Sequence, residues 1–182
     1  MVSTRSLLNS LLAAALLAAP AAAAPGKVGD AAPAFSLTRL DGKHVTLRSL
    51  KGKVVVIDFW ATWCAPCLAT MPDAARLQHD YGGKGLVVLG VSLDDDDAKL
   101  KAFMARRPPG ITVVKPDAAF NHAYGTFLGL KGDALVTPDK LIQANLPTWI
   151  LIDRKGRVAA IHKSSTEEKQ LLAEAGALAG RS

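Results

Sequence analysis

The chain has two cysteines, Cys64 and Cys67, separated only by Ala65 and Pro66. The pair follows a continuous apolar run and stands where a helical pattern begins. At the start of a helix, free backbone N–H groups and the helix dipole stabilise a thiolate on the first cysteine and lower its pKa below about 8.5. The second cysteine, one turn further on, can attack a mixed disulfide and release the product. The spacing predicts thiol–disulfide exchange, with Cys64 as the exposed nucleophile and Cys67 as the buried resolving thiol.

Other uses of a cysteine pair fit the sequence less well. A four-cysteine zinc site would need a second pair, which the chain does not have. A c-type haem attachment site needs histidine directly after the second cysteine, and Leu68 occupies that position. A purely structural disulfide would add little stability, because it closes a loop of only two residues. The histidines are scattered, and the aspartate run 94–97 lacks calcium-loop spacing, so we expect no metal site.

The cysteine pair lies between two elements that the sequence marks clearly. Val54–Trp60 is a continuous run rich in β-branched residues, typical of a strand that is covered on both faces. Ala65–Tyr81 has helical periodicity and ends at a pair of glycines, and Pro72 inside it is expected to kink the helix. Residues 86–93 predict a second buried strand.

Shorter elements complete the pattern. The acidic run at 94–97 is read as the N-cap and first turn of a helix. Only residues 125–145 have no clear period. Strands that alternate with helices predict one α/β domain with a central mixed sheet. The remaining predicted elements are a hairpin of strands 35–37 and 44–47, a helix that the run 94–97 opens and that continues through 107, a strand at 111–114, a helix at 117–124, a hairpin of strands 149–152 and 158–162, and a final helix 166–179 opened by a capping box of Ser165 and Glu168.

The composition limits the classes of partner. The 182 residues suit a single domain of ordinary size, and 49% apolar content supplies a core. The net charge is +6, but the positive side chains are scattered as single residues and pairs. Aromatic residues make up only 5%, too few for the stacking platforms of a single-strand binder. We therefore expect no nucleic-acid partner.

The N-terminal segment has the layout of a secretory signal peptide. Arg5 precedes the apolar stretch 7–17, and a run of alanines at 21–24 follows. Pro20 and the weak hydrophobicity of alanine argue against an uncleaved membrane anchor. We expect residues 1–24 to be removed and residues 25–182 to form the mature domain. Its compartment would be the periplasm, where disulfides persist.

Several stretches, in this order and at this spacing, resemble the thioredoxin superfamily, and most closely its exported TlpA/ResA-like thiol–disulfide oxidoreductases. The resemblance runs from about residue 29 to residue 178. It implies a thioredoxin-like α/β fold, a central mixed sheet flanked by helices, with an N-terminal β-hairpin and an insertion before the cis-proline strand. The stretches are residues 51–56, 58–67, 86–92 and 146–148, and then 152–153 before 155–156.

The resemblance assigns roles to residues outside the cysteine pair. Pro147 matches the cis-proline that packs against the disulfide, which leaves backbone groups of Leu146 available to an extended substrate strand. Thr148 follows, just before the predicted strand 149–152, and is counted with Leu146 and Pro147 among the substrate-binding residues. Asp58 matches the buried acid of thioredoxins: burial would raise its pKa, and it would accept the proton of Cys67 during resolution. A structural, hydrogen-bonded Asp58 is the alternative.

Three further positions surround the pair. Trp63 is expected to shield the disulfide and to give partner proteins an apolar contact, and Pro66 completes this substrate-binding surface. Thr70 departs from the resemblance, because many TlpA/ResA-like proteins carry glutamate three residues after the second cysteine. Proton transfer would then depend on Asp58 alone.

The resemblance implies a reductase of protein disulfides that receives electrons from a membrane thiol–disulfide donor. Its redox group would be the Cys64–Cys67 disulfide, with no other cofactor, and cytochrome c maturation or copper-site assembly are candidate pathways. Two alternatives stay open. A Sco-like copper metallochaperone would use both cysteines and a distant histidine, for which His162 is a loose candidate. A peroxiredoxin-like peroxidase would need proline, threonine and arginine around Cys64.

Overall fold

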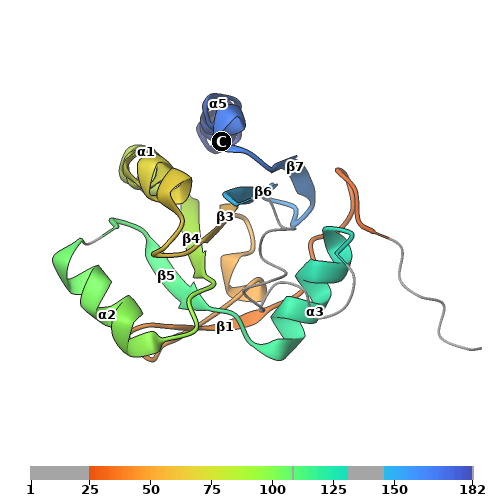
Figure 1. Cartoon of the computed structure of the whole chain (residues 1–182). Coiled ribbons are helices and arrows are strands. Elements are labelled where there is room, and N and C mark those ends of the chain that lie inside the picture. The colour runs from red at the N-terminus through yellow and green to blue at the C-terminus, as the bar shows by residue number, and fades with distance from the viewer. Residues whose placement is uncertain (1–24, 108, 131–145, 182) are drawn as a thin grey trace, which may run out of the picture.

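A seven-stranded mixed sheet forms the centre of the protein in the computed structural model, which describes residues 25–107, 109–130 and 146–181 (Figure 1). The order of the strands across the sheet is β2-β1-β5-β4-β3-β6-β7. This arrangement confirms the predicted α/β class and the N-terminal hairpin. The strands are β1 (Ser36–Arg39), β2 (His44–Thr46), β3 (Val54–Trp60), β4 (Leu86–Ser92), β5 (Thr112–Lys115), β6 (Thr148–Ile152) and β7 (Val158–His162).

Strand β3 lies inside the sheet, between β4 and β6, and all seven of its residues are buried. It pairs in parallel with β4 and antiparallel with β6. A strand enclosed on both edges and both faces has no position for an exposed polar side chain, which accounts for its β-branched sequence. Asp58 is the one ionisable residue in this strand, so its burial needs a separate explanation.

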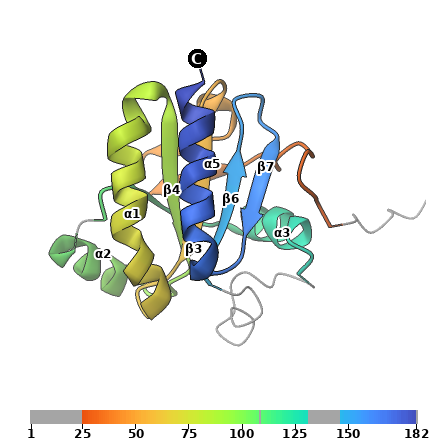
Figure 2. The same ribbon diagram turned by 90° about the horizontal axis from the view of Figure 1, so that it is seen from above.

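The helices divide between the two faces of the sheet (Figures 1 and 2). Helices α1 (Ala65–Tyr81) and α5 (Glu168–Gly180) lie side by side over one face, and α3 (Ala118–Phe127) covers the other. Helix α2 (Asp97–Arg106) packs beside β5 and directs Leu100 and Phe103 towards Trp60. The 3-10 turns are η1 (Arg48–Leu50), η2 (Gly82–Lys84) and η4 (Ser165–Glu167).

The start of the last helix differs from the prediction. Ser164, and not Ser165, is the capping residue, and it accepts from the backbone N–H of Thr166 to begin the η4 turn. Helix α5 then begins at Glu168 without a side-chain cap. The predicted capping box is therefore wrong. Glu168 does not reach back to a backbone N–H, and its carboxyl is free to face the interior.

Two predicted features lie partly or wholly outside the described residues. The predicted signal segment, residues 1–24, is one of them. Helix α3 continues to Phe127, so it takes the first residues of the stretch 125–145 that was predicted to lack structure, and residues 131–145 are not described. Among the helices of the described ranges, none has the length and apolar character needed to span a membrane.

Candidate active site

The two cysteines form a disulfide at the N-terminus of α1. Cys64 is the N-cap residue, and the backbone N–H of Cys67 points at its Sγ from 3.3 Å. Pro66 sits in the first turn, where its missing N–H removes no helical hydrogen bond. The same N–H groups that cap the helix would stabilise a thiolate on Cys64 once the disulfide is reduced.

Burial of the cysteines agrees with the prediction for Cys67 and contradicts it for Cys64. Cys67 is 1% exposed, as expected for a buried thiol. Cys64 is only 5% exposed, so it is not an exposed residue in the disulfide form. The reason is a tertiary cluster in which both cysteines pack with Trp60 and with Leu100 of α2. Cys64 remains the more accessible of the two sulfur-bearing residues.

Asp94 holds the loop before the cysteines in place. Its carboxylate accepts hydrogen bonds from the backbone N–H of Thr62 at 3.1 Å and from the Thr62 hydroxyl at 2.5 Å. Ser92, at the end of β4, donates to the same carboxylate at 2.8 Å. The run 94–97 was predicted to open a helix, but Asp96 is the residue that caps α2, and Asp94 lies outside the helix. Asp94 is therefore a site residue that the local sequence did not reveal.

Asp58 is buried in the middle of the sheet, 2% exposed, beneath the helices α1 and α5. Burial raises its pKa from 3.8 to about 7, a hydrogen bond with Trp149 opposes that rise, and the charge of Glu168 adds to it. The Oδ1 atom has no hydrogen-bond partner among the described residues. A carboxyl whose pKa is close to neutral can both accept and return a proton under ordinary conditions. The predicted direction of the pKa shift is confirmed.

The segment before β6 completes the surroundings of the disulfide. The Leu146–Pro147 bond is cis, as predicted. Leu146 packs against the cluster that contains both cysteines, while Pro147 and Thr148 are buried. Since Thr148 pairs with Phe59 near the end of β3, the cis-proline lies at the same edge of the sheet as the cysteines.

Trp63 and Pro66 are the exposed residues next to the disulfide. The side chain of Trp63 is 58% exposed, which is unusual for a tryptophan in a folded domain. Pro66 is also exposed, next to the disulfide. Of the predicted substrate-binding residues, the structure packs Leu146 against the cysteine cluster and leaves Trp63 and Pro66 exposed on either side of Cys64 in the chain. Thr70 is buried, and its hydroxyl donates to the carbonyl of Cys67 at 3.0 Å.

His162 is separate from the cysteines. It is buried on β7, where its Nε2 lies 3.0 Å from a carboxylate oxygen of Glu174. Within the described ranges, no three histidine, cysteine, aspartate or glutamate side chains gather as a metal site would require. The ligand set of the copper alternative is therefore not assembled by these residues.

Known proteins are similar to this chain over most of its length. The sequence pattern of the Redoxin family matches residues 27–178. The thiol-disulfide oxidoreductase ResA of Bacillus cereus (strain ATCC 10987 / NRS 248) is 33% identical over 145 residues, which cover 80% of this chain and 75% of the relative. The ResA of Bacillus anthracis is 40% identical over 137 residues, covering 72% and 67%.

Solved structures with similar folds identify the fold of this chain. A candidate thiol:disulfide interchange protein DsbE from Chlorobium tepidum superimposes with a TM-score of 0.67 at 31% identity, covering 85% of this chain and 99% of that one. A second Chlorobium tepidum protein of the thioredoxin family gives a TM-score of 0.69 at 24% identity. The expected thioredoxin-like fold is thereby confirmed.

Proposed function

Since the chain belongs to the Redoxin family and is a thiol–disulfide oxidoreductase of the ResA/DsbE type, we propose that it is exported to the periplasm and reduces disulfides in protein substrates. The observation that carries this proposal is a disulfide at the N-cap of α1, beside an exposed Trp63. A large exposed apolar side chain next to a reactive sulfur suits a protein partner, because aromatic anchors dominate protein contacts.

The first step is attack by the reduced enzyme. The Cys64 thiolate attacks one sulfur of the substrate disulfide, and the substrate S–S bond breaks as the Cys64–substrate S–S bond forms. The other substrate sulfur leaves as a thiolate and takes a proton from solvent. The N–H of Cys67 holds the attacking thiolate at the helix start until the partner arrives.

The second step returns the enzyme to the disulfide form. Asp58 accepts the proton of Cys67, and the Cys67 thiolate attacks Sγ of Cys64. The mixed disulfide breaks, the second substrate sulfur leaves as a thiolate, and two electrons have passed to the substrate. A membrane thiol–disulfide donor then restores the dithiol. The dithiol/disulfide pair is the redox group, and the proposed cycle uses no further cofactor.

The substrate strand lies along the segment before β6. Pro147 is in the cis form, and Leu146 before it packs against the cluster that contains both cysteines. Backbone groups of Leu146 pair with the extended substrate, as in recognition by strand addition. Trp63 and Pro66 supply apolar contact on the other side. Specificity for one partner protein would come from side-chain contacts around these residues.

Trapping of substrates tests the proposed function. In a Cys67→Ser variant, Cys64 captures a substrate but nothing releases it, so defined mixed disulfides accumulate in an exporting bacterial host. A variant with both cysteines replaced by serine is the matched control. Recovery of apocytochromes c would assign the enzyme to cytochrome c maturation. Identical recovery from the trap and the control would refute protein-disulfide exchange.

The direction of transfer has its own test. The Cys64/Cys67 couple is equilibrated with glutathione buffers, and the fraction of disulfide is measured by alkylation. A reductase is expected to have a potential nearer thioredoxin, at about −270 mV, than the strong oxidant DsbA, at about −120 mV. A potential close to that of DsbA would overturn the reductase direction while leaving thiol–disulfide exchange intact.

Export is tested by the N-terminus of the secreted product. The full chain is expressed in a Gram-negative host, and the periplasmic fraction is analysed by intact mass. A mature protein beginning at Ala24 or Pro25 supports the proposed cleavage. Full-length protein confined to the cytoplasm would contradict export.

A further inference from the structure

A small cavity lies between the sheet and the helices α1 and α5. The centre of a water molecule can occupy about 10 Å³ of it, close to the smallest space that holds one water. Apolar side chains such as Val56 make up most of the wall. The hydroxyl-bearing Thr70 and the carboxyl-bearing Glu168 also line it, from α1 and α5 respectively. The cavity therefore has room for one water and polar groups to hold it.

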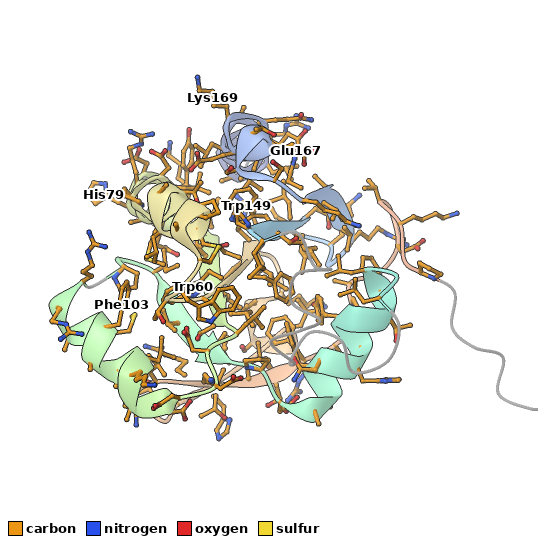
Figure 3. The ribbon with its side chains drawn as sticks, viewed as in Figure 1. Trp60, His79, Phe103, Trp149, Glu167 and Lys169 are labelled. Carbon is orange, nitrogen blue, oxygen red and sulfur yellow. A yellow bond between two sulfur atoms is a disulfide. The ribbon has the colours of Figure 1, made fainter. Side chains whose placement is uncertain are left out.

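The carboxyl of Glu168 has two different surroundings. Its Oε1 is buried and has no hydrogen-bond partner among the residues that the structure describes. The same carboxyl shares a hydrogen bond with Asp73 of α1, although Glu168 as a whole is only half-buried. In Figure 3, Lys169 points away from the sheet on the outer side of α5 and Glu167 lies to the side of the helix. Glu168 thus connects the interior with the surface.

Asp58 adjoins the wall of this cavity, because Trp149, which shares a hydrogen bond with Asp58, lines it. Side chains along a strand alternate between the two faces, so Val56, Asp58 and Trp60 share a face of β3. Val56 lines the cavity, whereas Trp60 packs in the cluster that contains Cys67. On α1, Thr70 stands one turn beyond Cys67 and lines the cavity. Asp58, with its unpartnered Oδ1, therefore stands on the face of β3 that connects the cavity wall at Val56 with the cysteine cluster at Trp60.

We propose that Glu168 is a positioning residue of the resolution step, which passes the proton of Asp58 to the surface through one water in this cavity. The inference rests on the role proposed above for Asp58. The proton leaves Sγ of Cys67 for the Asp58 carboxylate as Cys67 attacks Cys64. Asp58 then gives a proton to the water, and the water gives one to Oε1 of Glu168. Glu168 loses a proton to solvent at its exposed side, which restores both carboxylates.

The charges on α1 and β3 suit this exchange. Burial first, and then the charge and hydrogen bond of Asp73, raise the pKa of Glu168, while the Arg76 guanidinium opposes the rise. The charge of Glu168 in turn raises the pKa of Asp58. Each carboxyl therefore becomes easier to ionise once the other has been protonated, so one proton alternates between them.

The charged side chains on the other elements packed against α5 have partners away from the cavity. Glu167 of η4 accepts from the backbone N–H of Lys163 at 2.9 Å. His162 of β7 is held by Glu174 at 3.0 Å. Strand β6 presents no titratable side chain to α5, because its sequence is TWILI. Within the described residues, the groups that govern protonation at the cavity are Asp58, Glu168 and Asp73 with its partner Arg76.

The test separates the two chemical steps in a stopped-flow experiment. Reduced protein reacts with one equivalent of dithiobisnitrobenzoate, an aromatic disulfide whose thiolate product is yellow. Attack by Cys64 releases the first thiolate, and attack by Cys67 releases the second. In Glu168→Gln we expect the second phase to slow by about tenfold near pH 7. This is less than the full rate enhancement of general acid–base catalysis, about 100-fold or more, because Asp58 is still present. The first phase is expected to stay within twofold of wild type.

Two variants keep the proposal falsifiable. Glu174→Gln removes the same charge from the same helix and should leave both phases within twofold of wild type. Adding Thr70→Glu to Glu168→Gln places a carboxyl on the opposite wall of the cavity and should restore at least half of the lost rate. A second phase in Glu168→Gln within twofold of wild type between pH 5.5 and 8.5 would overturn the proposal. Equal slowing in Glu174→Gln would do the same, since it would reflect charge on the helix alone.

The pH profile adds a readout that a structural role would not move. Burial is the larger cause of the raised pKa of Glu168, and Asp73→Asn removes the second, so the midpoint of the second phase should move to lower pH with its plateau rate unchanged. An unmoved midpoint would overturn the coupling. All of these measurements use a small disulfide, so they stand even if trapping shows that the enzyme has no protein substrate.

Discussion

Each face of the sheet covers a buried ionisable side chain, Asp58 on one and Tyr124 on the other, and the two differ in whether their polar atoms are satisfied. Tyr124 of α3 is fully buried, and its hydroxyl donates to the carbonyl of Pro33 at 3.0 Å. Burial raises the pKa of Tyr124 above its usual value, so the phenol is neutral at any working pH. Asp58 on the opposite face has an unpartnered Oδ1 and a pKa of about 7. One group stabilises the fold, and the other changes charge where the chemistry takes place.

The surroundings of the two groups follow the same division. Under α3, Phe59, Phe120 and Tyr124 form an aromatic cluster. The rings of Phe120 and Tyr124 are stacked, with 4.3 Å between their centroids. Under α1 and α5, the described side chains with unpartnered buried atoms include Trp60 as well as Asp58 and Glu168. Unsatisfied buried polar atoms reduce the free energy of unfolding, so their presence near the disulfide points to function. The Oδ1 of Asn121 on α3 is also unpartnered, and nothing in the structure explains it.

Truncation of the aromatic cluster should give the largest change in stability. Phe120→Ala removes a ring that is 2% exposed and that contacts three other rings, so we expect a loss of about 3–5 kcal/mol in the free energy of unfolding. Urea denaturation measures the loss. In the folded protein, release of the second nitrobenzoate thiolate should remain within twofold of wild type. A tenfold slower release would show that the two faces are not independent.

Replacement of Asp58 should have the opposite effect on stability. Asp58→Asn removes a buried carboxyl that is more easily ionised in the unfolded chain, so the variant should gain up to about 4 kcal/mol in free energy of unfolding at high pH. The same change should slow resolution by about tenfold or more, because the proton acceptor is lost. Unfolding and stopped-flow measurements on the same samples test both expectations.

The pH dependence of this gain identifies its cause. The pKa of Asp58 is higher in the folded protein, so between about pH 4 and pH 7 the folded state binds more protons than the unfolded chain. Wild-type stability from this group is fully present below pH 4 and is lost as the pH rises to 7. The difference between Asp58→Asn and wild type should therefore widen across that range and level off above it. A constant difference would show that Asp58 does not titrate there.

The central elements were predictable because their signals are local. Strand Val54–Trp60 and helix Ala65–Tyr81 have the bounds that the sequence suggested. A continuous β-branched run is typical of a strand that is buried on both faces. Pro66 marks the first turn of the helix, and the pair of glycines marks its end. The burial of Asp58 also followed from its position inside an apolar run.

The parts that sequence analysis missed depend on contacts between distant segments. Asp94 stands 32 residues from Thr62, and its own neighbours suggest only a helix start. Glu168 was predicted to cap a helix, while its partners are on α1 and β3. The burial of Cys64 similarly requires Leu100 of α2. No local pattern carries this information, because the contacts exist only after the sheet and helices have assembled.

Removal of the Tyr124 hydroxyl should have a smaller effect. Tyr124→Phe leaves the stacked ring in place and loses one hydrogen bond to Pro33, for an expected loss of about 1–2 kcal/mol in the free energy of unfolding. Because the phenol is neutral throughout, the loss should be the same at about pH 5 and pH 8, in contrast to Asp58→Asn. A loss that changes with pH would remove the distinction between the two faces.

The smallest effect on stability is expected at Trp63. Its side chain is 58% exposed, so Trp63→Ala should change the free energy of unfolding by less than about 0.5 kcal/mol. Both phases with the small aromatic disulfide should also be nearly unchanged, since that reagent needs only the sulfur atoms. Reduction of a protein disulfide such as that of insulin should slow several-fold, because the apolar contact with the partner is lost. Equal slowing with both substrates would mean that Trp63 affects the reactivity of Cys64. The exposed tryptophan would then contribute to the chemistry of the disulfide and not to partner binding.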